Sequence, residues 1–332
     1  NLAAHVLGYV GARQATLNGR PITETTGKDG IERTLESRLA GVRGWRITEK
    51  TRNSRELVAF RDQDIEQQDG DNVVLTIDSV IQNIVESELA IAMEKHKPIS
   101  VSSIVMRPRT GEILAMATLP NFDPNNLADS TADERRNRVI TDTAEPGSTF
   151  KIVTVSGALN EHVVNPTEVF DCENGYFHYA NRVLTDHGHY QLLTVEGIIT
   201  KSSNIGAAKI GIKLGENRLY DYMRAYGFGS PTEIALPGEV RGTVHPVREW
   251  TKVSIAQIPM GHYVTVTPLQ MIMAMGAIAN GGVLMRPMLV ARLEDREHNV
   301  LATYYPQKVR RVISEETARK MVAALKTVPT PE

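Results

Sequence analysis

At positions 145 to 151 the chain reads Glu145-Pro146-Gly147-Ser148-Thr149-Phe150-Lys151. A Pro-Gly pair is typical of a turn, and the apolar pattern that follows, from Thr149 to Asn160, predicts a buried helix. Lys151 projects from the same helical face as Ser148 because it follows three residues later. A desolvated lysine has a lowered pKa and can take a proton from a neighbouring hydroxyl. The heptad therefore predicts an activated serine nucleophile, although a serine at a helix start is also an ordinary N-cap.

The composition is that of a globular protein. The 332 residues are 41% hydrophobic and 23% charged, which allows one large domain and a smaller one. The net charge of -2 disfavours a nucleic-acid-binding surface. The single cysteine, Cys172, excludes an intrachain disulfide. No apolar run reaches the length of a membrane span, but because the chain opens on Asn1 within an apolar segment, we expect the natural N-terminus to lie further upstream.

The pattern along the chain predicts two regions of an α+β protein. Residues 1–70 form a small module that has too few apolar residues for a core of its own, and residues 71–332 form the larger domain. In the first region we expect a helix over 31–39 and strands over 45–51 and 56–60. The second region opens with a strand over 73–77, a helix capped by Asp78 with Ile81, Ile84, Val85, Leu89 and Met93 on its apolar face, and a hairpin of strands 101–106 and 112–118.

Further helical patterns follow the Ser148 helix. After a loop-rich stretch, 160–193, they cover 194–214, 217–226, 268–279 and 314–325. Thr267 and Ser314 are suitable N-caps for the last two. Ser202-Ser203-Asn204 interrupts the first of these patterns with poor helix formers. This predicts either a short loop that directs Ser202 and Asn204 into a cleft, or a solvated helix face.

A serine three residues before a lysine, followed some fifty residues later by Ser-x-Asn, is a pattern of serine enzymes that react with β-lactams. The chain resembles a class B penicillin-binding protein over nearly its whole length. Supporting stretches are His5 to Gly11, Gly30 to Glu36, Thr76 to Gln82, Thr110 to Met116, Asn121 to Asn125 and Val266 to Gln270. The resemblance implies an α+β transpeptidase fold, in which an antiparallel sheet is flanked by helices and joined to a helical subdomain, with a small N-terminal pedestal.

The resemblance also implies roles for four residues. Ser148 would be the nucleophile, Lys151 its base, Ser202 a proton relay, and Asn204 a ligand of the substrate. The implied reaction is D,D-transpeptidation of D-Ala-D-Ala stem peptides through a seryl ester, with β-lactams acylating the same serine and no cofactor. It further implies a membrane glycosyltransferase partner, and a periplasmic location with an N-terminal membrane anchor that is absent from this sequence.

The sequence departs from the family at the third motif, Lys-Ser/Thr-Gly. Lys326-Thr327-Val328 is similar, but valine replaces the glycine and the segment ends a helical pattern, whereas the family motif lies on a strand. The strands expected after that motif are also missing, and a lone hairpin is marginally stable in water. We therefore expect further residues beyond Glu332, and an impaired enzyme if these strands are absent.

Four alternatives remain open. Asp186 with His187 or His189 could form a Ser-His-Asp triad with Ser148, although no Gly-x-Ser-x-Gly surrounds the serine. Cys172, His178, His187 and His189 could bind a metal, but their spacing fits no zinc template. The domain could also be a D,D-carboxypeptidase or β-lactamase-like hydrolase, or a non-catalytic sensor that is acylated by β-lactams without turnover.

Overall fold

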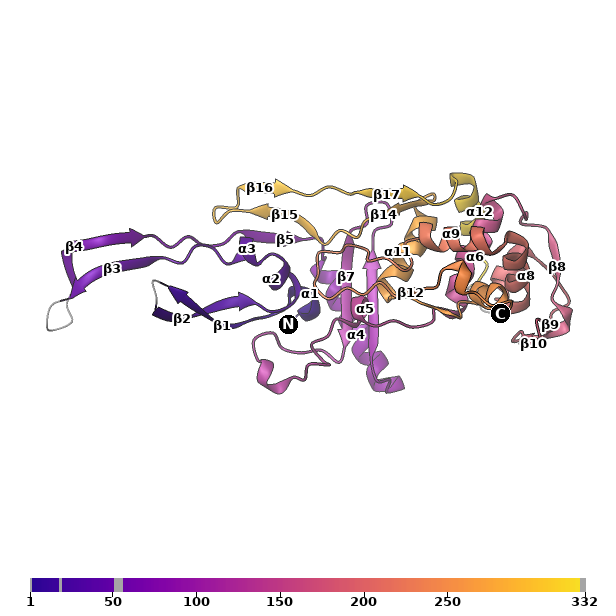
Figure 1. Cartoon of the computed structure of the whole chain (residues 1–332), viewed down its shortest axis with the longest axis horizontal. Helices are drawn as coiled ribbons and strands as arrows, with labels where there is room; N and C mark the ends of the chain where they lie inside the picture. The colour runs from indigo at the N-terminus through magenta and orange to yellow at the C-terminus, as the bar shows by residue number, and fades with distance from the viewer. Residues whose placement is uncertain (1, 18–19, 51–55, 329–332) are drawn as a thin grey trace.

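The computed structural model describes residues 2–17, 20–50 and 56–328. The molecule is elongated, with the N-terminal hairpins at one end and most of the helices at the other (Figure 1). Thr51, at the end of one predicted strand, lies outside the described residues. No helix in the described ranges is both long and apolar enough to cross a membrane.

The N-terminal region consists of short helices and two antiparallel hairpins. Strands β1 (Val10–Leu17) and β2 (Arg20–Gly27) form one hairpin, and β3 (Trp45–Lys50) and β4 (Glu56–Ile65) form the other. The helices are α1 (Ala4–Leu7), α2 (Gly30–Thr34) and α3 (Glu36–Leu39). The single helix predicted over 31–39 is wrong in one respect, because Leu35 leaves the helical conformation (φ -109°, ψ 22°) and separates α2 from α3.

A three-stranded sheet joins distant parts of the chain. Strand β5 (Asn72–Leu75) pairs with β15 (Val290–Glu294), which pairs with β16 (Val300–Thr303). Just after β5, the Thr76 hydroxyl donates to the carbonyl oxygens of Ile113 (2.7 Å) and Met288 (2.9 Å). The strand predicted near residue 73 is thus held by residues more than 200 positions later.

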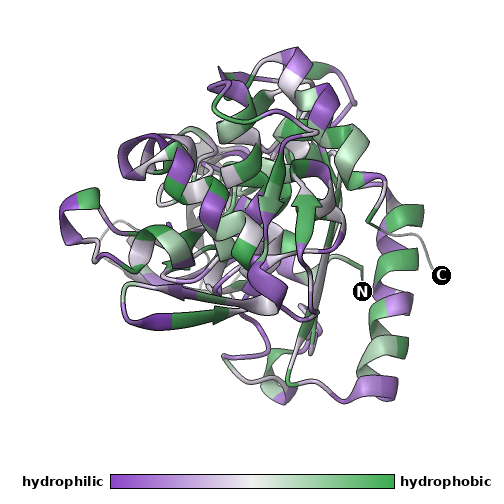
Figure 2. Ribbon diagram, turned by 90° about the vertical axis from the view of Figure 1, so that its right-hand side faces the viewer, coloured by the Kyte–Doolittle hydropathy of each residue, from purple (hydrophilic) through white to green (hydrophobic). Residues whose placement is uncertain are grey.

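The hairpin of β6 (Val101–Met106) and β7 (Ile113–Leu119) forms as predicted, and α4 (Ser79–His96) packs against it. The Asp78 carboxylate caps α4 by accepting from the N–H groups of Val80 and Ile81. The predicted apolar face is wrong at Ile84, which is 54% exposed. Gln82 is buried instead. Its polar side chain is tolerated there because it donates to the carbonyl of Met116 (3.0 Å) and accepts from the N–H of the same residue (2.8 Å). Figure 2 shows α4 at the side of the molecule, with hydrophobic segments along it.

A bundle of helices surrounds α6 (Lys151–Asn160), which follows the 3₁₀ turn η2 (Gly147–Phe150). Nine of the ten α6 residues are buried, which is expected of a helix that is enclosed on all sides. Its neighbours are α8 (Asn204–Leu214), α9 (Glu216–Ala225) and α12 (Glu315–Leu325). Helix α11 (Pro268–Ala279) lies beside α12 and begins with a capping box of Thr267 and Gln270. The predictions for 268–279 and 314–325 are confirmed.

The helical pattern over 194–214 contains two helices. Helix α7 (Val195–Thr200) ends before Ser202, and α8 begins at Asn204, so of the two alternatives the short loop is the one present. The loop-rich stretch before α7 holds two small antiparallel pairs, β8 (Val169–Asp171) with β11 (Leu192–Thr194) and β9 (Tyr176–Tyr179) with β10 (Arg182–Thr185).

The remaining elements are short. They are η1 (Leu127–Asp129), α5 (Arg138–Thr141), η3 (Glu173–Gly175), β12 (Thr243–Val244), η4 (Val247–Glu249), α10 (Ser254–Gln257), η5 (Ile258–Met260), β13 (Val264–Thr265), β14 (Val283–Met285) and β17 (Lys308–Arg311).

Candidate active site

Ser148 is exposed on the 3₁₀ turn that leads into α6. The preceding Gly147 has a φ of +57°, and Gly261, at a φ of +80°, packs directly against it. A Cβ atom on Gly261 would lie only 2.1 Å from the Gly147 carbonyl oxygen, so only glycine fits there. The Ser148 turn is therefore positioned by backbone contact with the segment after η5.

Lys151 is the first residue of α6 and is 2% exposed. Its ammonium is within hydrogen-bond distance of four acceptors: Ser148 Oγ at 3.1 Å, Ser202 Oγ at 2.9 Å, the Ser202 carbonyl at 2.5 Å and Asn204 Oδ1 at 2.9 Å. Burial lowers the pKa of Lys151 to about 8, and the negative charge of Asp186 partly opposes this shift. Lys151 thus contacts both the Ser148 motif, of which it is part, and the Ser202-Ser203-Asn204 motif. Its lowered pKa means that it loses its proton more readily than an ordinary lysine.

The turn between α7 and α8 gives Ser202 an unusual backbone conformation. Its φ is +55°, a left-handed value that is costly for a residue other than glycine. The N–H of Ser203 donates to the Ile198 carbonyl and that of Ser202 to the Ile199 carbonyl, which is the Schellman pattern of helix ends. The next helix begins at once, with Ser203 as its N-cap. Strain at such a position is common at functional sites.

Asn204 is held by both ends of its side-chain amide. The oxygen accepts from Lys151, and the nitrogen donates to the Thr185 carbonyl at 3.0 Å. The structure therefore brings together all four residues that the sequence singled out: Ser148, Lys151, Ser202 and Asn204.

Two carboxylates make hydrogen bonds at this site that were not predicted. The Asp186 carboxylate accepts from the Ser203 hydroxyl and from backbone N–H groups at the start of α8. Near the nucleophile, the Glu145 carboxylate accepts from the N–H of Tyr263 (2.9 Å) and lies 2.8 Å from His262 Nδ1, and these hydrogen bonds lower the pKa of Glu145. Both carboxylates join segments that are separate in the sequence, and no local pattern reveals these hydrogen bonds.

The alternative triad is not assembled. Asp186 binds the start of α8, and His189 Nδ1 lies 3.1 Å from the Asn174 carbonyl oxygen, so these side chains face other partners. Cys172 is buried against the Ser203 hydroxyl (Sγ to Oγ, 3.4 Å), and burial raises the pKa of its thiol. Among the described residues, no three His, Cys, Asp or Glu side chains are grouped to hold a metal.

The Lys326-Thr327-Val328 segment continues from the end of α12 and does not form a strand. Lys326 is the C-cap, and the Thr327 hydroxyl contacts the hydroxyl of Thr200 at 2.5 Å. The end of α12 thus lies beside the end of α7. The expectation of further residues beyond Glu332 stays a prediction.

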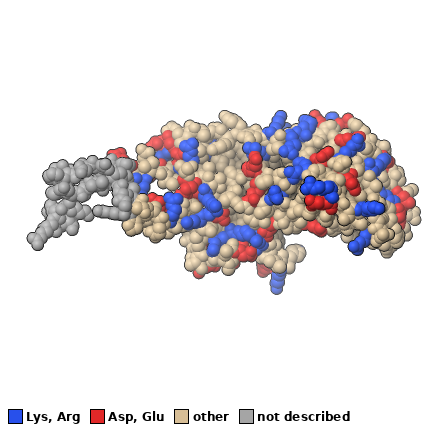
Figure 3. Space-filling view, in the orientation of Figure 1, with Lys and Arg blue, Asp and Glu red and all other residues tan. Residues whose placement is uncertain are grey.

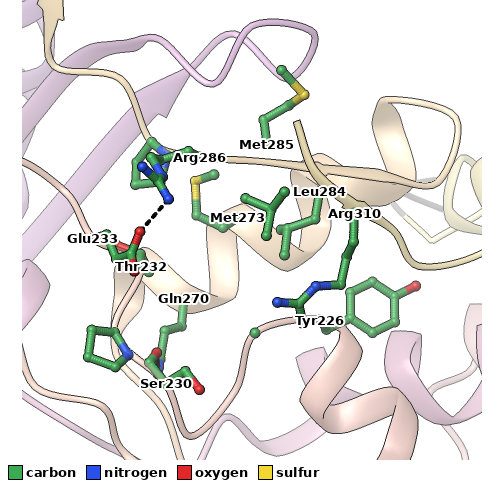
Figure 4. Close-up of a pocket in the computed structure, with 14 residues that line it drawn as sticks. Tyr226, Ser230, Thr232, Glu233, Gln270, Met273, Leu284, Met285, Arg286 and Arg310 are labelled. Carbon is green, nitrogen blue, oxygen red and sulfur yellow. Dashed lines mark hydrogen bonds and ion pairs between the residues drawn. The ribbon is translucent and has the colours of Figure 1, made fainter. Parts of the chain in front are cut away.

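A separate pocket of about 360 Å³ lies between α11, β14 and the loop after α9 (Figure 4). An ion pair between Arg286 and Glu233 is drawn at its edge, and Met273 and Leu284 supply apolar lining. None of the four candidate residues lines it. On the face shown in Figure 3, basic and acidic side chains are interspersed.

Residues 101–332 match the family model for the penicillin-binding protein transpeptidase domain. The chain belongs to this family. Residues 1–75 match a second model, that of the penicillin-binding protein dimerisation domain. The domain boundary between residues 70 and 71 rests on the change in hydrophobic pattern along the sequence and stays a prediction.

Relatives of this penicillin-binding protein agree with that assignment. The chain is 31% identical to the stage V sporulation protein D of Bacillus subtilis, over 98% of this chain and 49% of the relative. It is 30% identical to the peptidoglycan D,D-transpeptidase FtsI of Escherichia coli K12, over 99% of this chain and 52% of the relative. The chain therefore spans about half the length of the curated relatives it matches.

Solved structures show the same fold. Penicillin-binding protein 3 of Mycobacterium tuberculosis, complexed with ampicillin, matches with a TM-score of 0.83 and 29% identity, over 100% of this chain and 67% of that one. Penicillin-binding protein 2X of Streptococcus thermophilus matches with a TM-score of 0.84 and 27% identity, over 98% of this chain and 48% of that one. The mixed α+β transpeptidase fold with an N-terminal pedestal is thus confirmed.

Proposed function

We propose that this chain is the catalytic part of a peptidoglycan D,D-transpeptidase that β-lactams acylate. The observation that carries the proposal is the position of Lys151 Nζ, which contacts the hydroxyls of Ser148 and Ser202 and the amide oxygen of Asn204. A relative is named as a peptidoglycan D,D-transpeptidase, and a related structure contains ampicillin, which supports the same activity and ligand class here.

Acylation begins with proton transfer from Ser148 to Lys151. With a pKa of about 8, roughly a tenth of Lys151 is neutral at pH 7, and the lone pair of the neutral amine accepts the Ser148 proton over 3.1 Å. The Ser148 oxygen then attacks the carbonyl carbon of the penultimate D-alanine. The first N–H groups of a helical turn lack acceptors within the turn, so the Ser148 N–H can stabilise the oxyanion.

Ser202 delivers the proton to the leaving group. Its hydroxyl lies 2.9 Å from Lys151 Nζ, which suits a relay from the protonated amine to the nitrogen of the departing D-alanine. The C–N bond breaks, D-alanine leaves as an amine, and the seryl ester remains. Asn204 holds the backbone amide of the donor peptide, in exchange for its contacts with Lys151 and the Thr185 carbonyl.

An amine from a neighbouring strand then attacks the ester, loses its proton to the Lys151 and Ser202 pair, and releases Ser148. Hydrolysis of the ester would require a base for water. Glu145 is three residues from Ser148, but its carboxylate is bound to Tyr263 N–H and His262, which favours aminolysis over the hydrolase alternative.

The substrate determines where the reaction occurs. Peptidoglycan lies outside the cytoplasmic membrane, so the proposal places the protein on the extracytoplasmic side, held there by an N-terminal anchor. A membrane glycosyltransferase partner belongs to the same proposal and is based on family resemblance. Co-purification of the protein with such an enzyme from bacterial membranes would test it.

A thioester analogue of D-Ala-D-Ala, supplied with and without a D-amino acid as acceptor, tests the activity. We expect the acceptor to divert the product from acid to amide and Ser148→Ala to abolish both products, while a chelator changes neither. Product acid alone, unaffected by acceptor, would indicate a hydrolase. Stable acylation by penicillin without thioester turnover would indicate a sensor.

A further inference from the structure

A carboxylate from the loop after β10 holds the first turn of α8. Asp186 Oδ2 accepts from the Ser203 hydroxyl at 2.6 Å. Asp186 Oδ1 accepts from the backbone N–H of Ile205 at 3.1 Å and from that of Asn204. These N–H groups are among those that a helix leaves without an intrahelical acceptor, so one side chain satisfies two of them.

The turn that Asp186 holds is the one that carries Ser202 and Asn204. Ser203, between them, is 0% exposed, and its Oγ accepts from the Gly206 N–H at 2.9 Å while donating to Asp186. The residue before Asp186 also contributes, because the Thr185 carbonyl accepts from the Asn204 amide at 3.0 Å. Residues 185 and 186 therefore fix the start of α8 from outside the helix.

We propose that Asp186 is a positioning residue for acylation: its carboxylate holds the Ser203–Ile205 turn so that Ser202 and Asn204 face Lys151. The inference rests on the proposed function, because it assigns Asp186 a part in the same reaction. The hydrogen bonds of Asp186 go to Ser203, Asn204 and Ile205, so it acts on the site through the α8 turn and through its negative charge.

The charged groups near Lys151 and Asp186 come from several elements. Lys151 comes from α6, and the charge that acts on it is that of Asp186. The charge of Asp186 also acts on the buried Cys172 thiol, on which the charges of Lys209 and Asp171 act as well. Lys209 Nζ forms an ion pair with Glu173 Oε1 at 2.5 Å. Asp186 is therefore the carboxylate that contacts the turn at the start of α8.

Two substitutions separate the charge from the hydrogen bonds. Asp186→Asn keeps the shape and one acceptor oxygen but removes the charge, and Asp186→Ala removes both. We expect the rate of acylation by a fluorescent penicillin to reach its plateau at a lower pH in both variants, because loss of the negative charge lowers the pKa of Lys151. The plateau rate should fall about tenfold or more in Asp186→Ala, since small displacements of catalytic groups have effects of this size. A smaller fall is expected in Asp186→Asn.

Asp171→Asn is the matched control, because its carboxylate accepts from the Glu173 N–H and does not touch α8. This variant should keep the wild-type plateau rate of acylation and the wild-type midpoint, that is, the pH at which the acylation rate reaches half of its plateau. An unchanged midpoint in both Asp186 variants, or a plateau within twofold of wild type in Asp186→Ala, would overturn the inference. A merely structural role would lower the melting temperature and leave the midpoint in place.

A second measurement does not depend on acylation. The pH dependence of Lys151 acetylation by acetic anhydride, followed by mass spectrometry, reports the titration of this amine in the folded protein. Its midpoint should move to lower pH in Asp186→Asn. If wild-type protein were not acylated by penicillin, the proposed function would fail, and the acetylation midpoint would still decide whether Asp186 acts on Lys151.

Discussion

Lys151 Nζ lies 2.9 Å from the hydroxyl of Ser202, which is 51 residues later in the chain. This contact unites the start of α6 with the turn between α7 and α8. It explains why a buried lysine is tolerated, since the amine is surrounded by four oxygen acceptors. It also gives the site one group that can serve both hydroxyls in turn.

The pH dependence of acylation should report Lys151. Because the neutral amine is the base and its pKa is about 8, the rate should rise about tenfold per pH unit between pH 6 and 7 and level off above pH 8. Stopped-flow measurement with a chromogenic β-lactam checks this. A rate that is flat from pH 6 to 9 would exclude Lys151 as the base.

The same pKa affects stability. The folded-state pKa of Lys151 is lowered, so the unfolded chain binds this proton more tightly. The contribution of Lys151 therefore opposes folding at low pH, and this penalty declines as pH rises from about 8 toward the ordinary lysine value. Lys151→Met should remove that part of the pH dependence when urea unfolding is compared at pH 7 and 9.

The left-handed backbone at Ser202 predicts a difference between two variants. Ser202→Ala and Ser202→Gly both remove the hydroxyl, and both should slow acylation about 10²-fold or more. Only glycine adopts a φ of +55° without strain, so Ser202→Gly should be more stable by about 0.5–1 kcal/mol after its greater unfolded-state entropy is included. Urea denaturation checks this, and equal stability of the two variants would show that the turn is unstrained.

Gly261 should be essential for the position of Ser148. A Cβ atom there would collide with the Gly147 carbonyl oxygen at 2.1 Å, which moves the nucleophile turn. Gly261→Ala should destabilise the protein by about 1–3 kcal/mol and slow acylation. Gly215→Ala is the control, because Gly215 also has a positive φ but nothing lies within 4 Å of its Cβ position. A normal acylation rate in Gly261→Ala would contradict this account.

Glu145 provides a test of the hydrolase alternative. Its carboxylate is bound to Tyr263 N–H and His262, so it should not activate water. Glu145→Gln should release bound penicillin at a rate within about twofold of wild type, as followed by loss of the covalent adduct. A large decrease in the release rate would instead identify Glu145 as a deacylating base.

Local signals in the sequence predicted several elements well. The Thr267-Pro268 start of α11 and the Asp78 cap of α4 depend on residues within one turn of the helix end, and both are present. The short loop at Ser202-Ser203-Asn204 was one of the two alternatives that the sequence left open, because those residues compete with the helical backbone. The three-residue spacing placed Lys151 next to Ser148.

Long-range contacts could not be predicted in this way. Periodicity assigned Ile84 to the core, but the actual face of α4 is set by the paired hydrogen bonds of Gln82 with Met116. Asp186 was considered only beside neighbouring histidines, whereas the structure shows it at the start of α8. The meeting of the two motifs was suggested by family resemblance and not by any spacing rule.

The identity of the acylated residue tests the central claim most directly. The protein is incubated with benzylpenicillin, digested and analysed by mass spectrometry, with Ser148→Ala treated in parallel. The account predicts a penicilloyl adduct on the peptide that contains Ser148, with the ester on that serine, and no adduct in the variant. An adduct on another residue, or one that persists in Ser148→Ala, would contradict it.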